Sequence, residues 1–358
     1  MITIGIRADG GPSIGLGHIM RCLSLAKELR KNGYQVYFLS KIREGIEKIQ
    51  KENFEVIKIG SNEEIKNRNG FCYGDLNSLE EESAEIIDVI RKIGLDLLII
   101  DSYNVSEQYF LSLKPHLKKL IYLDDLNKFV YPVDILINGN LTACYLSYRK
   151  YSPEEILLLG PKYNLIREEF RGLPKRTVKP EVKEIMLTTG GSYPYNMSVK
   201  ILDMLLQEEA TKDLIVNVVV GSSFTNQEEL INKSKRHSNI ILHFNPEKMS
   251  TLMLRSDIAI SAGGSTLYEL CACGTPTLAF ISADNQEFIV NKMDELGYIR
   301  SIGWHHSLDR HKLIKYLLEL KNDFQLRNSY KNKQQQLVDA RGSTRIVQVI
   351  NKVMGQGC

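Results

Sequence analysis

A single histidine closes a glycine-rich segment near the N-terminus. Residues 7–18 read RADGGPSIGLGH and run straight into a helix-like pattern. Glycines let the backbone turn tightly and approach a ligand. His18 would then start a helix, where the positive end of the helix dipole disfavours imidazolium and keeps the ring neutral. A neutral imidazole accepts a proton from water, so His18 is the candidate general base.

The alternative for His18 is a histidine that only hydrogen-bonds to the backbone at the start of a helix. That alternative leaves the crowded glycines unexplained, and we expect Gly15, Gly17 and Arg21 to contact a ligand. The segment does not match a dinucleotide fingerprint, because Met20 replaces the third glycine and no acidic residue ends the second expected strand. NAD is therefore disfavoured.

A second glycine-rich segment, SAGGSTLYE at residues 261–269, leads into another helical pattern. Small residues at a helix N-terminus leave backbone N–H groups for phosphate oxygens. Glu269 lies one helical turn beyond Ser265 and could accept two hydrogen bonds from a ribose diol. The alternative is that Ser265 only caps the helix and Glu269 is a surface charge. The candidate ligand-binding residues are Gly263, Gly264, Ser265, Thr266 and Glu269.

Two further groups of polar residues end expected strands. The sequence TTGGS at residues 188–192 could contact the same pyrophosphate through Gly190, Gly191 and Ser192, although a plain turn fits equally well. Asp101-Ser102-Tyr103 and Asp124-Asp125 end two other strands. Paired aspartates suggest Mg²⁺, but neighbours on a strand point to opposite faces and chelate poorly. Capping and polar lining are the better interpretation for one residue of each pair, and no metal ligands are expected.

The remaining candidates for chemistry are weaker. His305 and His306 follow the single tryptophan, Trp304, and we assign them to the surface or to packing. The cysteines are scattered without a CxxC pair, which gives no support for a metal or redox site. They are Cys22, Cys72, Cys144, Cys271, Cys273 and Cys358. No cofactor is expected.

Strand-like runs alternate with helical patterns in the first half of the chain, which predicts a doubly wound parallel sheet. The expected strands are residues 2–6, 35–39, 96–101, 120–124 and 134–138. The expected helices are residues 18–30, 42–51, 79–93 and 106–117.

The alternation stops near residue 160 and then starts again. Residues 157–184 are polar and contain three prolines, so they are the expected linker. Strands are expected at 184–189, 214–220, 240–244, 257–261 and 276–280, helices at 197–206, 265–273 and 286–296, and helical structure from 308 onward. We expect an α/β protein of two Rossmann-like doubly wound domains with a cleft between them. The expected domains are residues 1–160 and 161–340, with a C-terminal helix at 341–358 that returns to the first domain.

Composition narrows the class of partner. The chain has 358 residues, 43% of them hydrophobic and 25% charged, as in an average globular protein. Its formal net charge is only +3, without the clustered basic face that nucleic acids or acidic membranes require. The N-terminal sequence shows no secretory signal pattern, and no apolar run is long enough to span a bilayer. We expect a cytoplasmic protein with a small-molecule partner and leave its oligomeric state open.

With these residues in view, the chain resembles the hydrolase family of the pseudaminic acid pathway. The resemblance runs from Ile4 to about Arg345 and rests on RADGGPSIGLGHIMRC, IIDSY, YLDD, LGPKYNLIREEF and SAGGSTLYEL followed by GTP. Two positions depart from the family pattern. Tyr193 stands where an acidic residue is expected, and Ala340 stands where a second glycine is usual.

The resemblance implies a GT-B fold and hydrolysis of UDP-2,4-diacetamido-2,4,6-trideoxy-β-L-altropyranose to UDP and the free sugar. It implies that His18 activates water and that Tyr103 and Asn285 help to place water or sugar. It also implies that Ser265 and Glu269, in the second half of the chain, hold the nucleotide. Backbone N–H groups at helix N-termini would neutralise the departing UDP without an essential metal. Two alternatives stay open: a GT-B glycosyltransferase with a UDP-sugar donor, and a non-catalytic UDP-sugar-binding subunit.

Overall fold

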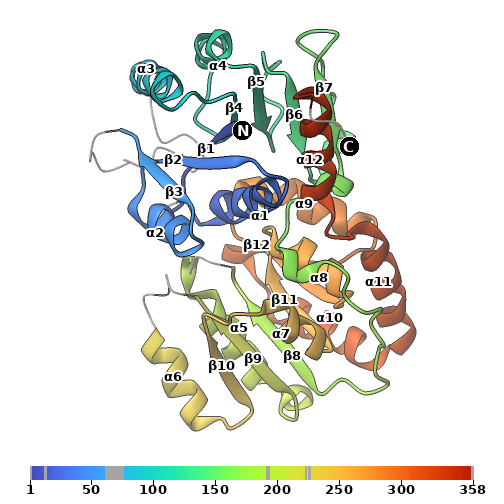
Figure 1. Cartoon of the computed structure of the whole chain (residues 1–358). Coiled ribbons are helices and arrows are strands. Elements are labelled where there is room, and N and C mark those ends of the chain that lie inside the picture. Colours follow the sequence, from blue (N-terminus) through green and yellow to red (C-terminus); the bar gives the residue numbers. More distant parts are fainter. Residues whose placement is uncertain are drawn as a thin grey trace. The chain divides into compact units, whose positions relative to one another are not determined.

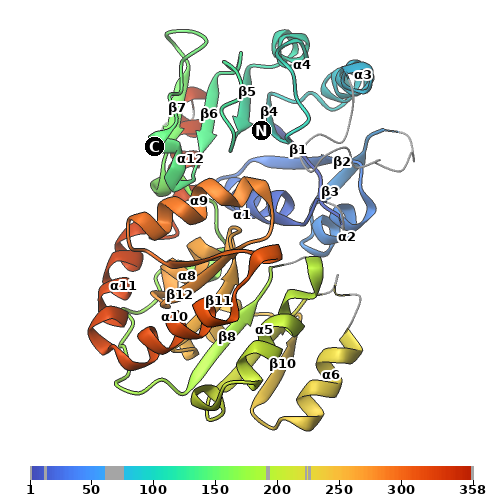
Figure 2. The same ribbon diagram turned by 180° about the vertical axis from the view of Figure 1, so that it is seen from behind.

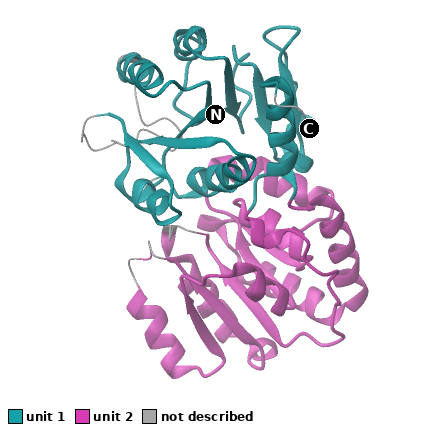
Figure 3. Ribbon diagram, in the orientation of Figure 1, with its two compact units in different colours: residues 1–166, 341–358 teal, residues 167–340 magenta. Residues whose placement is uncertain are grey.

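The computed structural model describes residues 2–11, 14–60, 76–190, 194–221, 224 and 227–355. The chain folds into two compact units (Figure 3). Unit 1 comprises residues 1–166 and 341–358, and unit 2 comprises residues 167–340. Each unit contains one parallel sheet with helices on its faces (Figures 1 and 2). The predicted α/β class with two doubly wound domains is confirmed.

The sheet of unit 1 has seven strands in the order β3-β2-β1-β4-β5-β6-β7. They are β1 (Thr3–Ala8), β2 (Gln35–Ser40), β3 (Glu55–Lys58), β4 (Leu97–Asp101), β5 (Lys119–Leu123), β6 (Ile135–Asn138) and β7 (Ile156–Leu159). The α-helices described in this unit are α1 (Gly17–Lys31), α2 (Arg43–Lys51), α3 (Leu76–Ile93), α4 (Glu107–Leu113) and α12 (Gly342–Val353). Short 3₁₀ turns are η1 (Lys114–His116), η2 (Leu141–Tyr145) and η3 (Pro161–Tyr163).

Alternation along the central strand β4 explains why this sheet is covered on both faces. Leu97 and Ile99 belong to a buried cluster with residues of α1 and α12. Leu98 and Ile100 point the other way, into a cluster with residues of α3 and α4. Because successive side chains of a strand point to opposite faces, a continuous apolar run is what a sheet buried on both sides requires.

The sheet of unit 2 has six strands in the order β10-β9-β8-β11-β12-β13. They are β8 (Glu184–Thr188), β9 (Ile215–Val220), β10 (Ile240–Phe244), β11 (Ile258–Ala262), β12 (Thr277–Ile281) and β13 (Arg300–Trp304). The α-helices described here are α5 (Met197–Leu206), α6 (Gln227–Arg236), α7 (Met249–Arg255), α8 (Thr266–Cys273), α9 (Asp284–Glu295), α10 (Arg310–Asn322) and α11 (Phe324–Leu337). Short 3₁₀ turns are η4 (Glu168–Phe170), η5 (Pro194–Asn196), η6 (Glu209–Thr211) and η7 (His305–Ser307).

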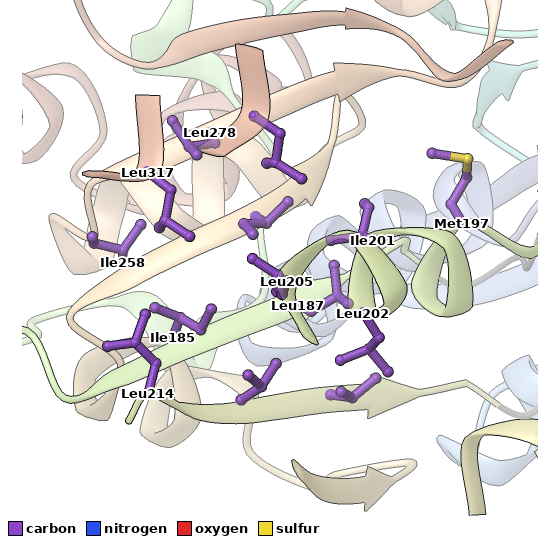
Figure 4. Close-up of a cluster of buried hydrophobic side chains, with 14 of the residues drawn as sticks. Ile185, Leu187, Met197, Ile201, Leu202, Leu205, Leu214, Ile258, Leu278 and Leu317 are labelled. Carbon is purple, nitrogen blue, oxygen red and sulfur yellow. The ribbon is translucent and has the colours of Figure 1, made fainter. Parts of the chain in front are cut away.

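One face of this second sheet packs into a large aliphatic core (Figure 4). Ile185 and Leu187 of β8 contribute to it from the sheet, and Ile201 of α5 and Leu317 of α10 contribute from the covering helices. All four side chains are fully buried. Burial of apolar area at this density is the main stabilising term for each unit.

The structure corrects several expected elements. The first three residues of the expected linker, 157–159, belong to strand β7, which extends the sheet of unit 1. Strands β3 and β13 and helices α6 and α7 were not expected. Strand β3 reads EVIK and helix α6 reads QEELINKSKR, so both have too few apolar residues to signal an element by periodicity.

Within the described ranges, no helix combines the length and the apolar character that a membrane span needs.

Candidate active site

Each sheet reverses its strand order at one point. The reversal lies between β1 and β4 in unit 1, and between β8 and β11 in unit 2. At such a point the two crossovers leave on opposite faces, and ligands of open α/β sheets bind beyond the carboxyl ends of these strands. The register pairs Ala8 with Asp101 and Thr188 with Ser261. Both glycine-rich segments and the Asp101-Ser102-Tyr103 sequence therefore follow strands of a reversal point.

His18 lies in the first turn of α1 and contacts a carboxylate from β4. Its Nδ1 is 2.5 Å from Oδ1 of Asp101. The Asp101 side chain is fully buried, and that of His18 is 13% exposed. A carboxylate accepts the Nδ1 proton, which leaves Nε2 as the nitrogen that can take up a proton from another molecule. Sequence reasoning considered only the helix dipole and missed this partner.

Arg21, one helical turn after His18, joins two carboxylates. Its Nε and Nη2 each donate to Asp101 at 2.6 Å, and its Nη1 donates to both oxygens of Asp125 at 2.9 Å. Burial on its own would raise the pKa of Asp101, but the charge of Arg21 and the hydrogen bonds from Arg21 and His18 outweigh it and hold the pKa well below its usual range. Asp101 is therefore a carboxylate at any physiological pH.

Tyr103 follows β4 and completes this group of side chains. Its ring packs edge-on against the His18 imidazole, with centroids 4.7 Å apart and an interplanar angle of 80°. Its hydroxyl donates to Oδ2 of Asp125 at 2.7 Å, and Asn140 Nδ2 donates to Oδ1 of Asp125 at 2.7 Å. The structure thus brings the predicted residues His18, Arg21 and Tyr103 together.

Sequence reasoning expected only capping or polar lining from Asp101 and Asp125, and it did not name Asn140. A signal was present, because each of these residues ends or follows one of the neighbouring strands β4, β5 and β6. We call the six side chains the His18 centre, and they are His18, Arg21, Asp101, Tyr103, Asp125 and Asn140.

Asp124 does not belong to this centre. Its carboxylate accepts the backbone N–H groups of Leu126 and Asn127 and the hydroxyls of Tyr131 and Tyr148. Burial raises the pKa of Asp124 above its usual value. Asp124 therefore binds the backbone of the loop that follows β5, which agrees with the capping expected of one member of the pair.

Different physical constraints require glycine at different positions of the first loop. Gly15 has a φ of +74°, where a side chain is strained, and it exchanges backbone hydrogen bonds with Gly11. A Cβ on Gly10 would approach Ile19 to 2.6 Å, so packing against α1 excludes one there. A Cβ on Gly15 or Gly17 would meet nothing within 4 Å, and their contact with a ligand stays a prediction.

The predicted phosphate-binding segment of unit 2 lies at the N-terminus of α8. A Cβ on Gly263 would approach Val290 of α9 to 2.3 Å, whereas one on Gly264 would meet nothing within 4 Å. Ser265 is exposed and Thr266 is half-buried. Ser265 occupies the N-cap position of α8, but its side chain makes no capping hydrogen bond. Binding of phosphate at this segment stays a prediction.

Glu269 is buried rather than a surface charge. It is 8% exposed, and its two oxygens accept from Nε and Nη2 of Arg167, both at 2.8 Å. Burial on its own would lower the pKa of Arg167, but the contact with Glu269 raises it. A ribose diol would have to share these carboxylate oxygens with the guanidinium, so the nucleotide role of Glu269 stays a prediction.

The other predicted residues of unit 2 fall in several places. Gly190 has a φ of +84° and open space at its Cβ position, but Gly191, Ser192 and Tyr193 lie outside the described residues. Asn285 is exposed in the first turn of α9, just after β12. It belongs to unit 2, whereas His18 and Tyr103 belong to unit 1. Ala340 has a φ of +56°, the left-handed region that favours the glycine usual in the resembled family.

The paired histidines pack against aromatic rings, as predicted. His305 stacks on Tyr195 with centroids 3.7 Å apart, and His306 stacks on Trp304 at 5.5 Å. Across the part of the chain that the structure describes, no group of three or more His, Cys, Asp or Glu side chains is arranged to hold a metal ion.

Comparisons of the sequence with known proteins identify a family model and several relatives. The family model of the glycosyltransferase family 28 C-terminal domain matches residues 185–346. The UDP-2,4-diacetamido-2,4,6-trideoxy-beta-L-altropyranose hydrolase of Campylobacter jejuni is 27% identical over 295 residues, which cover 82% of the chain and 96% of that protein. The chain is a homologue of this hydrolase. The resemblance predicted from the sequence motifs is thereby confirmed.

Two other relatives extend the comparison. The spore coat polysaccharide biosynthesis protein SpsG of Bacillus subtilis is 24% identical and covers 99% of each chain. An uncharacterized protein of Methanocaldococcus jannaschii is 33% identical over 80% of the chain. The chain spans only 57% of the length of that archaeal protein.

Solved structures identify the fold. MurG of Acinetobacter baumannii superposes with a TM-score of 0.67 at 14% identity, covering 98% of the chain and 99% of that protein. The complex of Staphylococcus aureus MnaA with UDP gives a TM-score of 0.65 at 16% identity, covering 100% and 98%. The fold of the chain is GT-B, as the resemblance implied.

Proposed function

We propose that the chain is a hydrolase of a UDP-sugar, with UDP-2,4-diacetamido-2,4,6-trideoxy-β-L-altropyranose as substrate. Its homologue of Campylobacter jejuni carries that activity in its name. The observation that carries the proposal is the contact of His18 with Asp101 at the strand-order reversal of unit 1. A buried carboxylate behind an imidazole is an arrangement that activates water.

In the proposed reaction, the oxygen of a water molecule attacks the anomeric carbon of the sugar while His18 Nε2 accepts a proton from it. The bond between that carbon and the β-phosphate oxygen breaks, and its electron pair leaves with UDP. Attack opposite to the leaving group inverts the anomeric carbon. Asp101 keeps the proton on Nδ1 and stabilises the imidazolium that forms. Tyr103, whose ring contacts the imidazole, helps to place water or sugar.

In the proposed reaction, residues of unit 2 bind the nucleotide. The N-terminus of α8, with Gly264, Ser265 and Thr266, presents backbone dipoles for the pyrophosphate. A donor directed at developing negative charge contributes on the order of 3 kcal/mol in a transition state. In the proposed reaction, backbone N–H groups therefore stabilise the negative charge of the departing UDP, and a metal is not required. Asn285 and Glu269 contribute to sugar and ribose binding in this scheme.

Hydrolysis in ¹⁸O-labelled water tests the proposal. Attack at the anomeric carbon puts the label in the free sugar, and mass spectrometry of the two products shows where it is. Label in UDP would mean attack at phosphorus and would contradict the proposed reaction. Proton NMR during the first turnovers would show the inverted anomer before mutarotation.

A glycosyltransferase is the second candidate, because the family 28 domain match and the fold of MurG both belong to that class. In that case an acceptor hydroxyl would replace water at the same carbon. Incubation with the UDP-sugar in the absence of any acceptor separates the two, because only the hydrolase releases UDP at a catalytic rate. Binding of UDP in a calorimeter without UDP release under any condition would instead indicate a binding subunit.

A further inference from the structure

The His18 centre contains one guanidinium and two carboxylates. Arg21 uses Nε and Nη2 for Asp101, both at 2.6 Å, and Nη1 for the two oxygens of Asp125 at 2.9 Å. The side chains of Asp101 and Asp125 are 0% and 12% exposed. Water therefore screens these charges weakly, and their mutual interactions are strong.

Arg21 is an unfavourable neighbour for a histidine that must accept a proton. Its Nη2 lies 3.3 Å from Nδ1 of His18, and a guanidinium can only donate hydrogen bonds. Its positive charge repels the imidazolium and also cancels the field of Asp101, which it contacts directly. With Asp101 and Arg21 alone beside it, His18 would gain little from its carboxylate partner.

The negative charge of Asp125 offsets the positive charge of Arg21. With His18 neutral, the centre holds one positive and two negative charges, and a proton on His18 makes the sum zero. The groups that contact His18 are Arg21 from α1, Asp101 from β4 and the Tyr103 ring after β4. The Cys22 thiol of α1 donates to Asp101, and Asp125 acts through Arg21. A centre that becomes neutral when it takes up a proton, in a weakly screened place, favours the protonated product of the base.

We propose that Asp125 is a positioning residue that serves as the counter-ion of Arg21, so that the charge of Asp101 is left to stabilise the imidazolium of His18. This inference rests on the proposed function for its catalytic consequence, but the electrostatic claim concerns the free protein. Asp125 also accepts hydrogen bonds from Tyr103 and Asn140, so a purely structural role is the alternative.

Asp125→Asn separates charge from structure, because the amide keeps one acceptor and nearly the same shape. The titration of His18 is followed by ¹H–¹⁵N NMR of the imidazole, with its signals assigned by their loss in His18→Gln. We expect the midpoint in Asp125→Asn to fall by about one pH unit relative to the wild type, the shift typical of losing one nearby opposite charge. The midpoint of the acid limb in the pH profile of kcat/KM for UDP release should move to lower pH by the same amount.

Asn140→Ser is the matched control. It removes a hydrogen bond to the same carboxylate without changing any charge, so we expect the midpoint to stay at the wild-type pH. An unchanged midpoint in Asp125→Asn, or an equal shift in Asn140→Ser, would overturn the proposal. A wild-type protein that never releases UDP while the midpoints shift as expected would overturn the proposed function instead.

Arg21→Gln gives an independent test in case Asp125→Asn does not fold. It removes the cation and leaves both carboxylates, so the midpoint of His18 should rise by about one pH unit. The double variant Arg21→Gln/Asp125→Asn should return towards the wild-type midpoint, because the two charges cancel in the native centre. A fall of the midpoint in Arg21→Gln would contradict the proposal.

Discussion

His18 depends on Asp101 for its tautomer. The carboxylate accepts from Nδ1 at 2.5 Å and also binds Arg21 through both of its oxygens. An imidazole whose Nδ1 carries the proton has its lone pair on Nε2, where it can act as a base. The proposed chemistry therefore requires an acceptor at position 101 and not merely a polar side chain.

Asp101→Asn tests this dependence. The amide of asparagine would turn its oxygen towards Arg21, which only donates, and its NH₂ group towards His18. Nδ1 then becomes the acceptor and Nε2 carries the proton, so the base is in the wrong form. We expect kcat/KM for UDP release to fall roughly a thousandfold, near the loss in His18→Ala, because general-base catalysis is worth 10²–10⁴-fold.

Asp134→Asn is the matched control for this prediction. Asp134 contacts Lys119 and the backbone N–H of Leu120 at the start of β5, whereas Asp101 lies at the carboxyl end of the neighbouring strand β4. Its kcat/KM should stay close to the wild-type value, while circular dichroism verifies the fold of both variants. A fully active Asp101→Asn variant would remove the proposed role of the carboxylate.

The sequence identified His18 and Arg21, and the resemblance added Tyr103, but neither gave Asp101, Asp125 or Asn140 a part in the chemistry, for a physical reason. A histidine after a run of glycines signals chemistry through its type and local context alone. Asp101 gains its role only because β1 pairs with β4, which brings together residues 83 positions apart. Asp125 and Asn140 depend in the same way on the order of β5 and β6 in the sheet.

A buried ion network that joins several helices and strands fixes the start of the first glycine-rich loop. Glu82 of α3 binds Arg7 of β1 at 2.6 Å, Lys41 at 2.5 Å and the Tyr109 hydroxyl at 2.8 Å. Arg7 in turn binds Asp9, at the beginning of the loop, at 2.7 Å. The network joins α3, β1 and the residue after β2, so it holds the loop that leads to His18.

The lowered pKa of Glu82 predicts how acid destabilises unit 1. Burial on its own would raise its pKa, but Arg7 and Lys41 outweigh burial and lower the pKa to about 2. A carboxyl with a lowered pKa in the folded protein stabilises it fully above its unfolded pKa, and this contribution is lost as the pH falls from about 5 towards 2. Breaking a buried pair by removing one partner costs on the order of 3 kcal/mol.

We therefore expect Glu82→Gln to lower the melting temperature at pH 7 and to weaken the loss of stability between pH 5 and pH 3. Calorimetric scans across this range, compared with the wild type, measure both effects. Glu81→Gln is the control, because Glu81 is exposed on the same helix. Equal pH dependence of the wild type and Glu82→Gln would show that the network does not determine acid stability.

Periodicity predicted the central strands well, but of the four edge strands in the two described sheets it identified β10 and missed β3, β7 and β13. The expected helix at residues 197–206 coincides with α5, whose buried residues recur at helical spacing. Strand β3 lies at the edge of its sheet with its ends exposed, so its sequence need not be apolar. Strand β13, also at an edge, ends in two half-buried residues, Gly303 and Trp304. Burial at the centre of a sheet produces the pattern, and an edge strand need not show it.

For the whole chain, the C-terminal helix belongs to the first unit. Ile346, Val347 and Ile350 of α12 are buried in the same cluster as α1 and β1. Thr344 donates to Glu28 of α1 at 2.9 Å, and Tyr34 donates to Asn351 at 2.6 Å. Unit 1 is therefore assembled from two segments separated by the whole of unit 2, and its core is incomplete until the last helix has been added.

Gly342 sets how closely this helix approaches the rest of unit 1. A Cβ at this position would lie 2.1 Å from the carbonyl oxygen of Asn164 and 2.7 Å from a backbone carbon of Tyr163. Backbone atoms cannot move aside as a flexible side chain can, so Gly342→Ala must displace the start of α12. Overpacking of this kind costs about 1–3 kcal/mol.

We expect Gly342→Ala to lower the hydrogen-exchange protection of α1 and α12 and to leave the strands of unit 2 protected as in the wild type. Gln348→Ala is the control, because Gln348 is exposed on the same helix and its truncation removes no buried contact. If the variant loosened both units equally, the two would unfold as one cooperative body. Unchanged protection of α1 and α12 would mean that the helix tolerates the displacement, and that its apolar face, rather than the close contact at Gly342, determines its attachment.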